Sequence, residues 1–150
     1  MDSAKQDTLI TMFSRLTDKI VRICGDDFEK KKKHLEAIAG DKLIASLGTI
    51  LSDNIDNFDN SKLLQTENIL RSLNRLCYYS TKLCLDAFNI GLINIIDKIF
   101  KLLENHSRKD GQISVLAYET ISLINSILAL RASPLPLVYV QLFWYLLNYV

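Results

Sequence analysis

Proline, the residue that most strongly disrupts helices, is almost absent from this chain. The 150 residues include two prolines, Pro134 and Pro136, and only five glycines. A proline ring removes a backbone donor and clashes with the preceding helical turn. Because both prolines follow Ser133, nothing earlier in the chain has to break a helix for lack of an amide hydrogen. This scarcity predicts an all-α fold.

An excess of charge of either sign is missing as well. The 18 Lys and Arg nearly balance the 17 Asp and Glu, which gives a formal net charge of +1. Proteins that bind nucleic acids or anionic membranes electrostatically carry a basic excess. We therefore expect no nucleic acid and no membrane as a partner. A hydrophobic share of 49% over 150 residues is enough for one domain with a core of its own.

Cysteines are few and odd in number. The chain has Cys24, Cys77 and Cys84, and it begins with a polar segment, Met1–Gln6, instead of a signal peptide. Both features favour a reducing compartment, cytoplasmic or nuclear. No histidine or carboxylate stands at ligand spacing beside Cys77 and Cys84, so we interpret them as small buried hydrophobic residues, not as metal ligands or nucleophiles.

The usual signatures of catalysis and of cofactor binding are also missing. The chain has no Gly-rich phosphate loop and no nucleophile paired with a base, and its two histidines, His34 and His106, stand apart. The acidic residues between Ser52 and Ser61 lack the spacing, the central Gly and the final Glu of a calcium loop. We expect no catalytic residue, no metal and no cofactor in this chain. A small helical enzyme remains a third alternative behind two binding hypotheses.

Three segments with helical apolar periodicity lie between Glu67 and Leu103. In the first, Ile69, Leu70, Leu73, Leu76 and Cys77 form one stripe. The second is too short to be stable alone, and the third has a single apolar face. We predict helices at 67–77, 81–88 and 91–103, which together have the form of one stacked helical-repeat unit.

The flanking sequence predicts four further helices and a loop. An amphipathic helix covers 3–24, with its inward stripe at Leu9, Met12, Phe13, Leu16, Ile20, Ile23 and Cys24. Other helices are expected at 28–39 with Phe28 inward, from 41 to 51, and at 112–130, with a surface loop at 52–61. The run Lys30–Lys33 is either a basic docking patch or a solvated face neutralised by nearby acidic residues.

The helical segments echo one another. Ile20, Ile23 and Cys24 correspond to Leu73, Leu76 and Cys77 at an offset of 53 residues, and a second correspondence has an offset of 49. Such a period is close to that of armadillo and HEAT repeats. We therefore predict an armadillo/HEAT-like α-solenoid of roughly two to three helical repeats over residues 1–136.

Residues 137–150 form a separate apolar run, LVYVQLFWYLLNYV. Its length is below the ~20 residues that span a bilayer. We expect a C-terminal helix that begins a further element or acts as a docking segment, through which the chain self-associates.

The sequence resembles a known family. Segments 13–24 (FSRLTDKIVRIC), 43–47 (LIASL), 69–77 (ILRSLNRLC) and 89–96 (NIGLINII) are similar to armadillo repeats. Their order, with the closing helix YETISLINSIL at 118–128 and the Leu-Pro at 135–136, resembles the end of the armadillo region in HECT-type ubiquitin ligases of the ubiquitin-fusion-degradation class. The tail after 136 is more hydrophobic than in that family, and the catalytic HECT domain with its thioester cysteine is not in this chain.

The resemblance implies a non-catalytic substrate-recognition segment of such a ligase, with protein or peptide substrates and ubiquitin-pathway components as partners. The alternative is a free-standing helical scaffold or adaptor that docks or oligomerises through its apolar tail.

In stacked three-helix repeats, the third helix of each unit lines a concave groove. This geometry predicts a protein-binding groove, with Asn74 and Asn125 at positions where armadillo proteins hold an asparagine that bonds the ligand backbone. An ordinary solvated helix face is the alternative for each position. The groove candidates are Arg15, Lys19, Arg22, Arg71, Asn74, Arg75, Tyr78, Tyr118, Glu119, Ser122 and Asn125.

Overall fold

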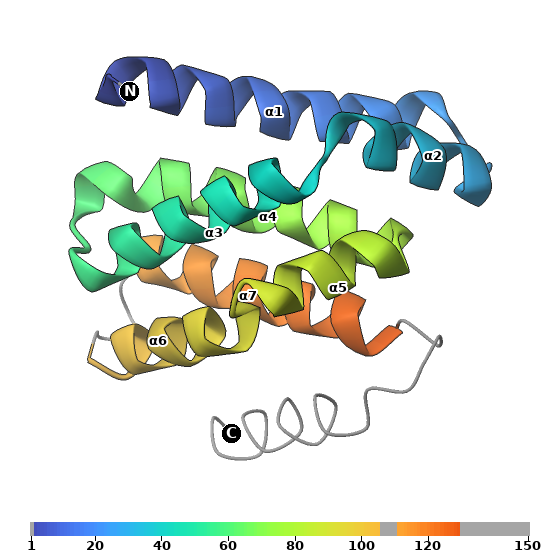
Figure 1. Ribbon diagram of the computed structural model, residues 1–150. Coiled ribbons are helices and arrows are strands. Elements are labelled where there is room, and N and C mark those ends of the chain that lie inside the picture. The colour runs from blue at the N-terminus through green and yellow to red at the C-terminus, as the bar shows by residue number, and fades with distance from the viewer. Residues whose placement is uncertain (1, 106–110, 130–150) are drawn as a thin grey trace.

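A computed structural model describes residues 2–105 and 111–129, and these residues are helical with no β-strand. The all-α prediction is confirmed for this part of the chain (Figure 1). The predicted C-terminal helix at 137–150 lies outside the described residues. The elements are α1 (Ser3–Ile23), α2 (Phe28–Ile38), α3 (Asp41–Asp56), the 3₁₀ turn η1 (Asn60–Lys62), α4 (Leu63–Tyr79), α5 (Thr81–Asn89), α6 (Leu92–Glu104) and α7 (Gly111–Ala129).

The helices form two layers. The long helices α1, α4 and α7 run in the same direction, with α4 between the other two (Figure 1). Helices α3 and α6 contact each other and make a second layer, while the short helices α2 and α5 both contact α4. No helix among the described residues is long and apolar enough to cross a membrane.

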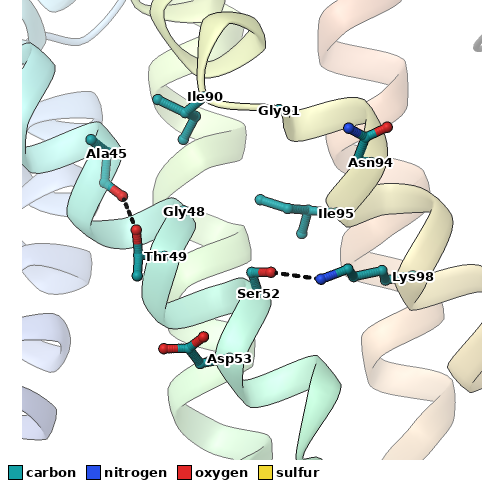
Figure 2. Close-up of a pocket in the computed structure, with 10 residues that line it drawn as sticks. All are labelled: Ala45, Gly48, Thr49, Ser52, Asp53, Ile90, Gly91, Asn94, Ile95 and Lys98. Carbon is teal, nitrogen blue, oxygen red and sulfur yellow. Dashed lines mark hydrogen bonds between the residues drawn. The ribbon is translucent and has the colours of Figure 1, made fainter.

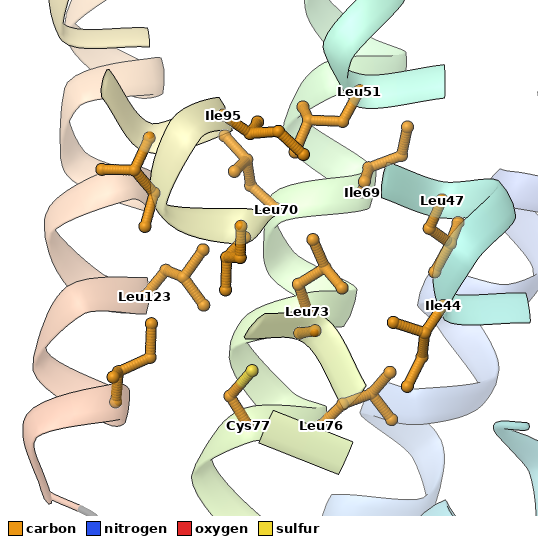
Figure 3. Packing of buried hydrophobic residues seen from close by; sticks show 14 of the residues in the cluster. Ile44, Leu47, Leu51, Ile69, Leu70, Leu73, Leu76, Cys77, Ile95 and Leu123 are labelled. Atoms are coloured by element: carbon orange, nitrogen blue, oxygen red, sulfur yellow. The ribbon is translucent and has the colours of Figure 1, made fainter. Parts of the chain in front are cut away.

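Helix α4 supplies the centre of the hydrophobic core. Its predicted stripe is buried in full, because Ile69, Leu70 and Cys77 are inaccessible and Leu73 and Leu76 nearly so. The single apolar face predicted for 91–103 is buried too, at Leu92, Ile95, Ile96, Ile99, Phe100 and Leu103. Figure 3 shows α3 and α7 residues meeting the α4 stripe. Removing a leucine or isoleucine side chain from water stabilises a fold by about 1.5–3 kcal/mol, so this stripe holds the layers together.

Side-chain caps set where two of the short helices begin. The Asp27 carboxylate accepts a hydrogen bond from the Lys30 amide at 3.0 Å, and the Ser80 hydroxyl accepts one from the Leu83 amide at 3.1 Å. Such caps satisfy amides that a first helical turn leaves without partners. Ser80 has an extended backbone, which ends α4 and starts α5 in a single residue.

The predicted loop at 52–61 is wrong over its first half, because α3 continues to Asp56. Asn54 and Ile55 are buried, and the Asn54 amide donates to Gln65 Oε1 at 2.8 Å. Polar residues that usually favour turns are tolerated here because α4 provides a hydrogen-bond partner.

The predicted inward stripe of α1 is also wrong in large part, since Leu9, Met12, Leu16 and Ile23 are exposed. Ile10, Ser14 and Thr17 are buried instead. Small polar side chains allow a close approach of α1 to α4, and α4 supplies the donor that they need. Phe28, expected inward on α2, is likewise about half exposed.

Gly91, the residue before α6, lies in the turn between α5 and α6. Its backbone is left-handed, with φ 89° and ψ 33°. An added Cβ would have room, since its nearest neighbour is Asn94 Nδ2 at 3.9 Å. Gly91→Ala should therefore destabilise the fold by about 1–3 kcal/mol through backbone strain alone. Urea unfolding monitored by circular dichroism measures this loss.

Gly40→Ala is the matched control. Gly40 has φ −108°, and an added Cβ would meet nothing within 4 Å. We expect a smaller loss for this variant than for Gly91→Ala, because both glycines are helix N-caps and only Gly91 has a left-handed backbone. Equal losses for the two alanine variants would contradict the strained turn.

Candidate protein-binding face

The predicted groove residues lie on α1, α4 and α7, the three parallel helices of one layer. We call the solvent side of this layer the α1–α4–α7 face. Its predicted residues differ in exposure. Exposed residues are Arg15, Lys19, Arg22, Tyr78, Tyr118 and Asn125; partly buried residues are Arg71, Asn74, Arg75 and Ser122; Glu119 is buried.

The prediction that Glu119 points outward is wrong, because only 5% of the residue is accessible. Arg71 of α4 is the reason: its Nε donates to Glu119 Oε1 at 2.9 Å, and its Nη2 pairs with Glu67. Burial lowers the pKa of Arg71, but hydrogen bonding and charge from Glu119 and Glu67 outweigh it and raise that pKa. Arg71 thus stays cationic and ties α4 to α7.

Arg75 ties α4 to α1 on the opposite side. Its Nη1 donates to the Ser14 carbonyl oxygen at 2.8 Å and to Thr17 Oγ1 at 3.0 Å. Asp18 lies 3.7 Å from Nη2. Burial lowers the pKa of Arg75 and outweighs the opposing charge of Asp18. Since an arginine begins from a pKa far above neutrality, the guanidinium remains charged.

Asn74 makes a third connection, because the Ser126 hydroxyl of α7 donates to Asn74 Oδ1. Its amide oxygen is therefore already used within the fold. Asn125, the other asparagine predicted to contact a ligand, is exposed and leaves its amide accessible. A backbone contact of the predicted kind is therefore easier to make at Asn125 than at Asn74.

Tyr78 belongs to an aromatic cluster at the C-terminal end of α4. Its ring centroid lies 4.7 Å from that of Tyr79 in an edge-to-face arrangement and 6.5 Å from that of Phe28. Lys31 Nζ lies 5.1 Å from the centre of the Tyr79 ring, within cation–π range. Tyr78 remains 44% exposed, so a rigid aromatic surface borders the face.

Sequence reasoning missed several partners of Arg71, Arg75 and Asn74. Ser14, Thr17, Glu67 and Ser126 complete the ties, and none was a groove candidate. One signal could have found Ser14 and Thr17: small polar residues at i and i+3 on a helix mark a side that another helix approaches closely. Glu67 stands four residues before Arg71 on the same helix, so the i, i+4 spacing could also have found it, whereas the long-range partner Glu119 gives no signal in local periodicity.

A shallow groove lies between the other two stacked helices, α3 and α6 (Figure 2). Its volume is about 350 Å³. Lys98 is held by Ser52 Oγ at 2.9 Å and by Asp56 at 3.0 Å, so the cation is already neutralised. Asp53, which is exposed, is the other charged residue of the lining. It is lined by Ala45, Gly48, Thr49, Ser52, Asp53, Ile90, Gly91, Asn94, Ile95 and Lys98.

All three cysteines are buried, and the surroundings of Cys77 also disfavour its reaction. Hydrogen bonding with Cys84, and then burial, raise the pKa of Cys77 well above its ordinary value, which disfavours the nucleophilic thiolate. Within residues 2–105 and 111–129, no three His, Cys, Asp or Glu side chains are grouped so that they could hold a metal ion.

Comparisons with protein-family models, with curated proteins and with solved structures found no match to this chain.

The Arg71–Glu119 tie can be measured directly. Arg71→Met should destabilise the fold by about 1–3 kcal/mol, because it leaves a buried carboxylate without its guanidinium. The double variant Arg71→Met/Glu119→Gln should lose less than the sum of the two single variants, since no charge is then stranded. Urea unfolding of the wild type, the two single variants and the double variant measures the coupling free energy between Arg71 and Glu119.

Arg22→Met serves as the control, because the Arg22–Asp18 pair is exposed. Its effect should stay within about 0.5 kcal/mol. Strict additivity of the Arg71 and Glu119 changes would rule out the tie.

Proposed function

We propose that this chain is a non-catalytic helical-repeat module, of the armadillo-like α-solenoid kind, that binds an extended segment of another protein across the α1–α4–α7 face. In this proposal α1, α4 and α7 are the third helices of successive repeats. Their parallel alignment, with α3 and α6 packed against one side of their layer, supports this assignment.

The observation that carries the proposal is the fixed position of Arg71 and Arg75 at the centre of the face. Both guanidinium groups are held by neighbouring helices, and part of Arg71 remains open to solvent. A ligand therefore meets donors whose conformational entropy is already lost, which makes binding less costly. Tyr78 and Tyr118 flank these donors, and tyrosine and arginine dominate interface hot spots.

We propose further that this module recognises substrate within a HECT-type ubiquitin ligase. The support is the sequence resemblance to the armadillo region of the ubiquitin-fusion-degradation class, which covers residues 13–136. Ubiquitin transfer would then belong to a separate HECT domain, because thioester chemistry needs a reactive cysteine and Cys77 is buried with a raised pKa.

Peptide display tests the binding face. The wild-type chain is used to select peptides from a random library, and affinities of the enriched peptides are measured for Arg15→Glu, Tyr118→Ala and Asn125→Ala. These side chains are exposed and are not among the ties described above, so the fold should survive. We expect losses of about 10-fold or more for Tyr118→Ala.

Leu85→Ala, on the exposed side of α5, is the control and should bind as the wild type does. Arg71 and Arg75 are left unchanged, because their replacement would weaken the fold as well as the face. Unaltered binding in all three face variants, or no peptide enrichment by the wild-type chain, would contradict the proposal.

The reading frame beyond codon 150 separates the two functional hypotheses. An in-frame HECT domain supports the ligase, whereas a stop codon there supports the free-standing scaffold. The scaffold's proposed contact, residues 137–150, lies outside the described ranges.

A further inference from the structure

Helix α1 has an exposed apolar side that the binding face does not use. Leu9, Met12, Leu16 and Ile23 are exposed by 52%, 60%, 43% and 69%. Their spacing of three, four and seven residues places them on one side of a helix. We call these four residues the α1 outer stripe. A continuous exposed apolar stripe of this kind marks an interaction surface.

The internal repeat indicates what kind of element covers such a stripe. At the offset of 53 residues, Leu16 and Ile23 correspond to Ile69 and Leu76 of α4. Ile69 is inaccessible to solvent and Leu76 nearly so. The same two positions are thus covered in one unit and open in the other.

An amphipathic helix provides that cover in the second unit. Helix α3 contacts α4, and its Ile44, Leu47 and Leu51 belong to the same core cluster as Ile69 and Leu76 (Figure 3). These α3 residues lie at i, i+3 and i+7, the spacing of a single apolar helical face. The occupant that fits the α1 outer stripe is therefore a helix with an α3-like apolar face.

The charges beside the stripe define the edge of that helix. Lys5 lies one turn before Leu9, Lys19 lies one turn after Leu16, and Arg15 is adjacent in sequence to Leu16. All three are exposed, and within the described residues no ion pair involves them. Asp18 is directed to Arg22 and Arg75 instead. This side of α1 is both apolar and basic.

We infer that the α1 outer stripe is a docking site for an amphipathic helix of a partner protein, with an apolar i, i+3, i+7 face and acidic residues along the edge that meets Lys5, Arg15 and Lys19. The argument rests on the exposure of α1 and on the covered positions of α4. Arg15 and Lys19 are shared with the α1–α4–α7 face, whereas Met12 and Leu16 are not, so Met12→Glu and Leu16→Glu distinguish the stripe from that face. Complementary charge fixes the register of such a helix and disfavours basic competitors.

Two synthetic amphipathic helices test this inference. They share the apolar spacing of Ile44, Leu47 and Leu51, and differ only in carrying Glu or Lys along one edge. Fluorescence anisotropy with the full chain should show binding of the Glu peptide, with the Lys peptide weaker by about 10-fold or more. Met12→Glu and Leu16→Glu should each reduce binding of the Glu peptide by about 10-fold or more, because they place a carboxylate in the apolar contact.

Charge reversal is the sharper arm of the test. Lys19→Glu should weaken binding of the Glu peptide and strengthen binding of the Lys peptide. A surface that binds through non-specific apolar contact would not show this reversal. Leu64→Glu changes an exposed leucine on α4 and is the matched control, with no expected effect on either peptide. Circular dichroism checks that each variant keeps the helical content of the wild type.

Four results would overturn the inference. Equal affinity for the Glu and Lys peptides, or no binding of either, would rule out an acidic helix as the partner. Concentration-dependent dimerisation in sedimentation velocity that Met12→Glu abolishes identifies a second copy as the occupant. Binding to phosphatidylserine vesicles that the same variant abolishes identifies a membrane surface.

Discussion

The enclosure of α4 is the constraint on which the rest of this structure depends. Its neighbours α1 and α7 cover its two flanks, and α2, α3 and α5 cover its apolar side. Only one strip of α4 meets solvent, and that strip holds Leu64, Arg71 and Tyr78. Contact with α4 therefore positions α1, α2, α3, α5 and α7, whereas α6 is held by α3, α5 and α7.

The polar residues of α4 give this packing its register. Hydrophobic contact is non-directional, so it would allow α1 and α7 to slide along α4. Arg75 reaches the Ser14 carbonyl oxygen on one flank, and Arg71 reaches Glu119 on the other. These contacts have defined geometry and lose their value if either helix shifts by one turn. The same two arginines therefore align the layer and present charge on its surface, which is why the structural role and the proposed binding role coincide there.

The parts of the fold that were predictable from sequence are those with a single apolar face. Helices α4, α5 and α6 each bury one stripe, so periodicity located their inward residues correctly. Helix α1 has apolar residues on two sides, one buried and one exposed. The apolar periodicity predicted burial of the side with the larger residues, Leu9, Met12 and Leu16. Ser14 and Thr17 are buried instead, because both hydrogen-bond to Arg75. Arg75 is 58 residues or more away in sequence, so the local pattern does not reveal it.

The candidate site was predictable to a similar degree. Position on a helix was enough to place Arg15, Tyr118 and Asn125 on an exposed surface. It could not distinguish Glu119, whose burial depends on a guanidinium from α4. Local pattern reports which side of a helix a residue occupies, whereas the identity of the neighbour on that side is a property of the assembled layers.

Native-state amide hydrogen exchange tests the central position of α4 most directly. Amides in elements with many buried contacts open only with global unfolding, whereas less covered elements open locally. We predict that the amides of residues 69–77 are the slowest to exchange in the chain, and that those of α1 and α2 exchange faster. Exchange in α4 as fast as in α1 would contradict the account, because α4 would then not be the helix that the others enclose.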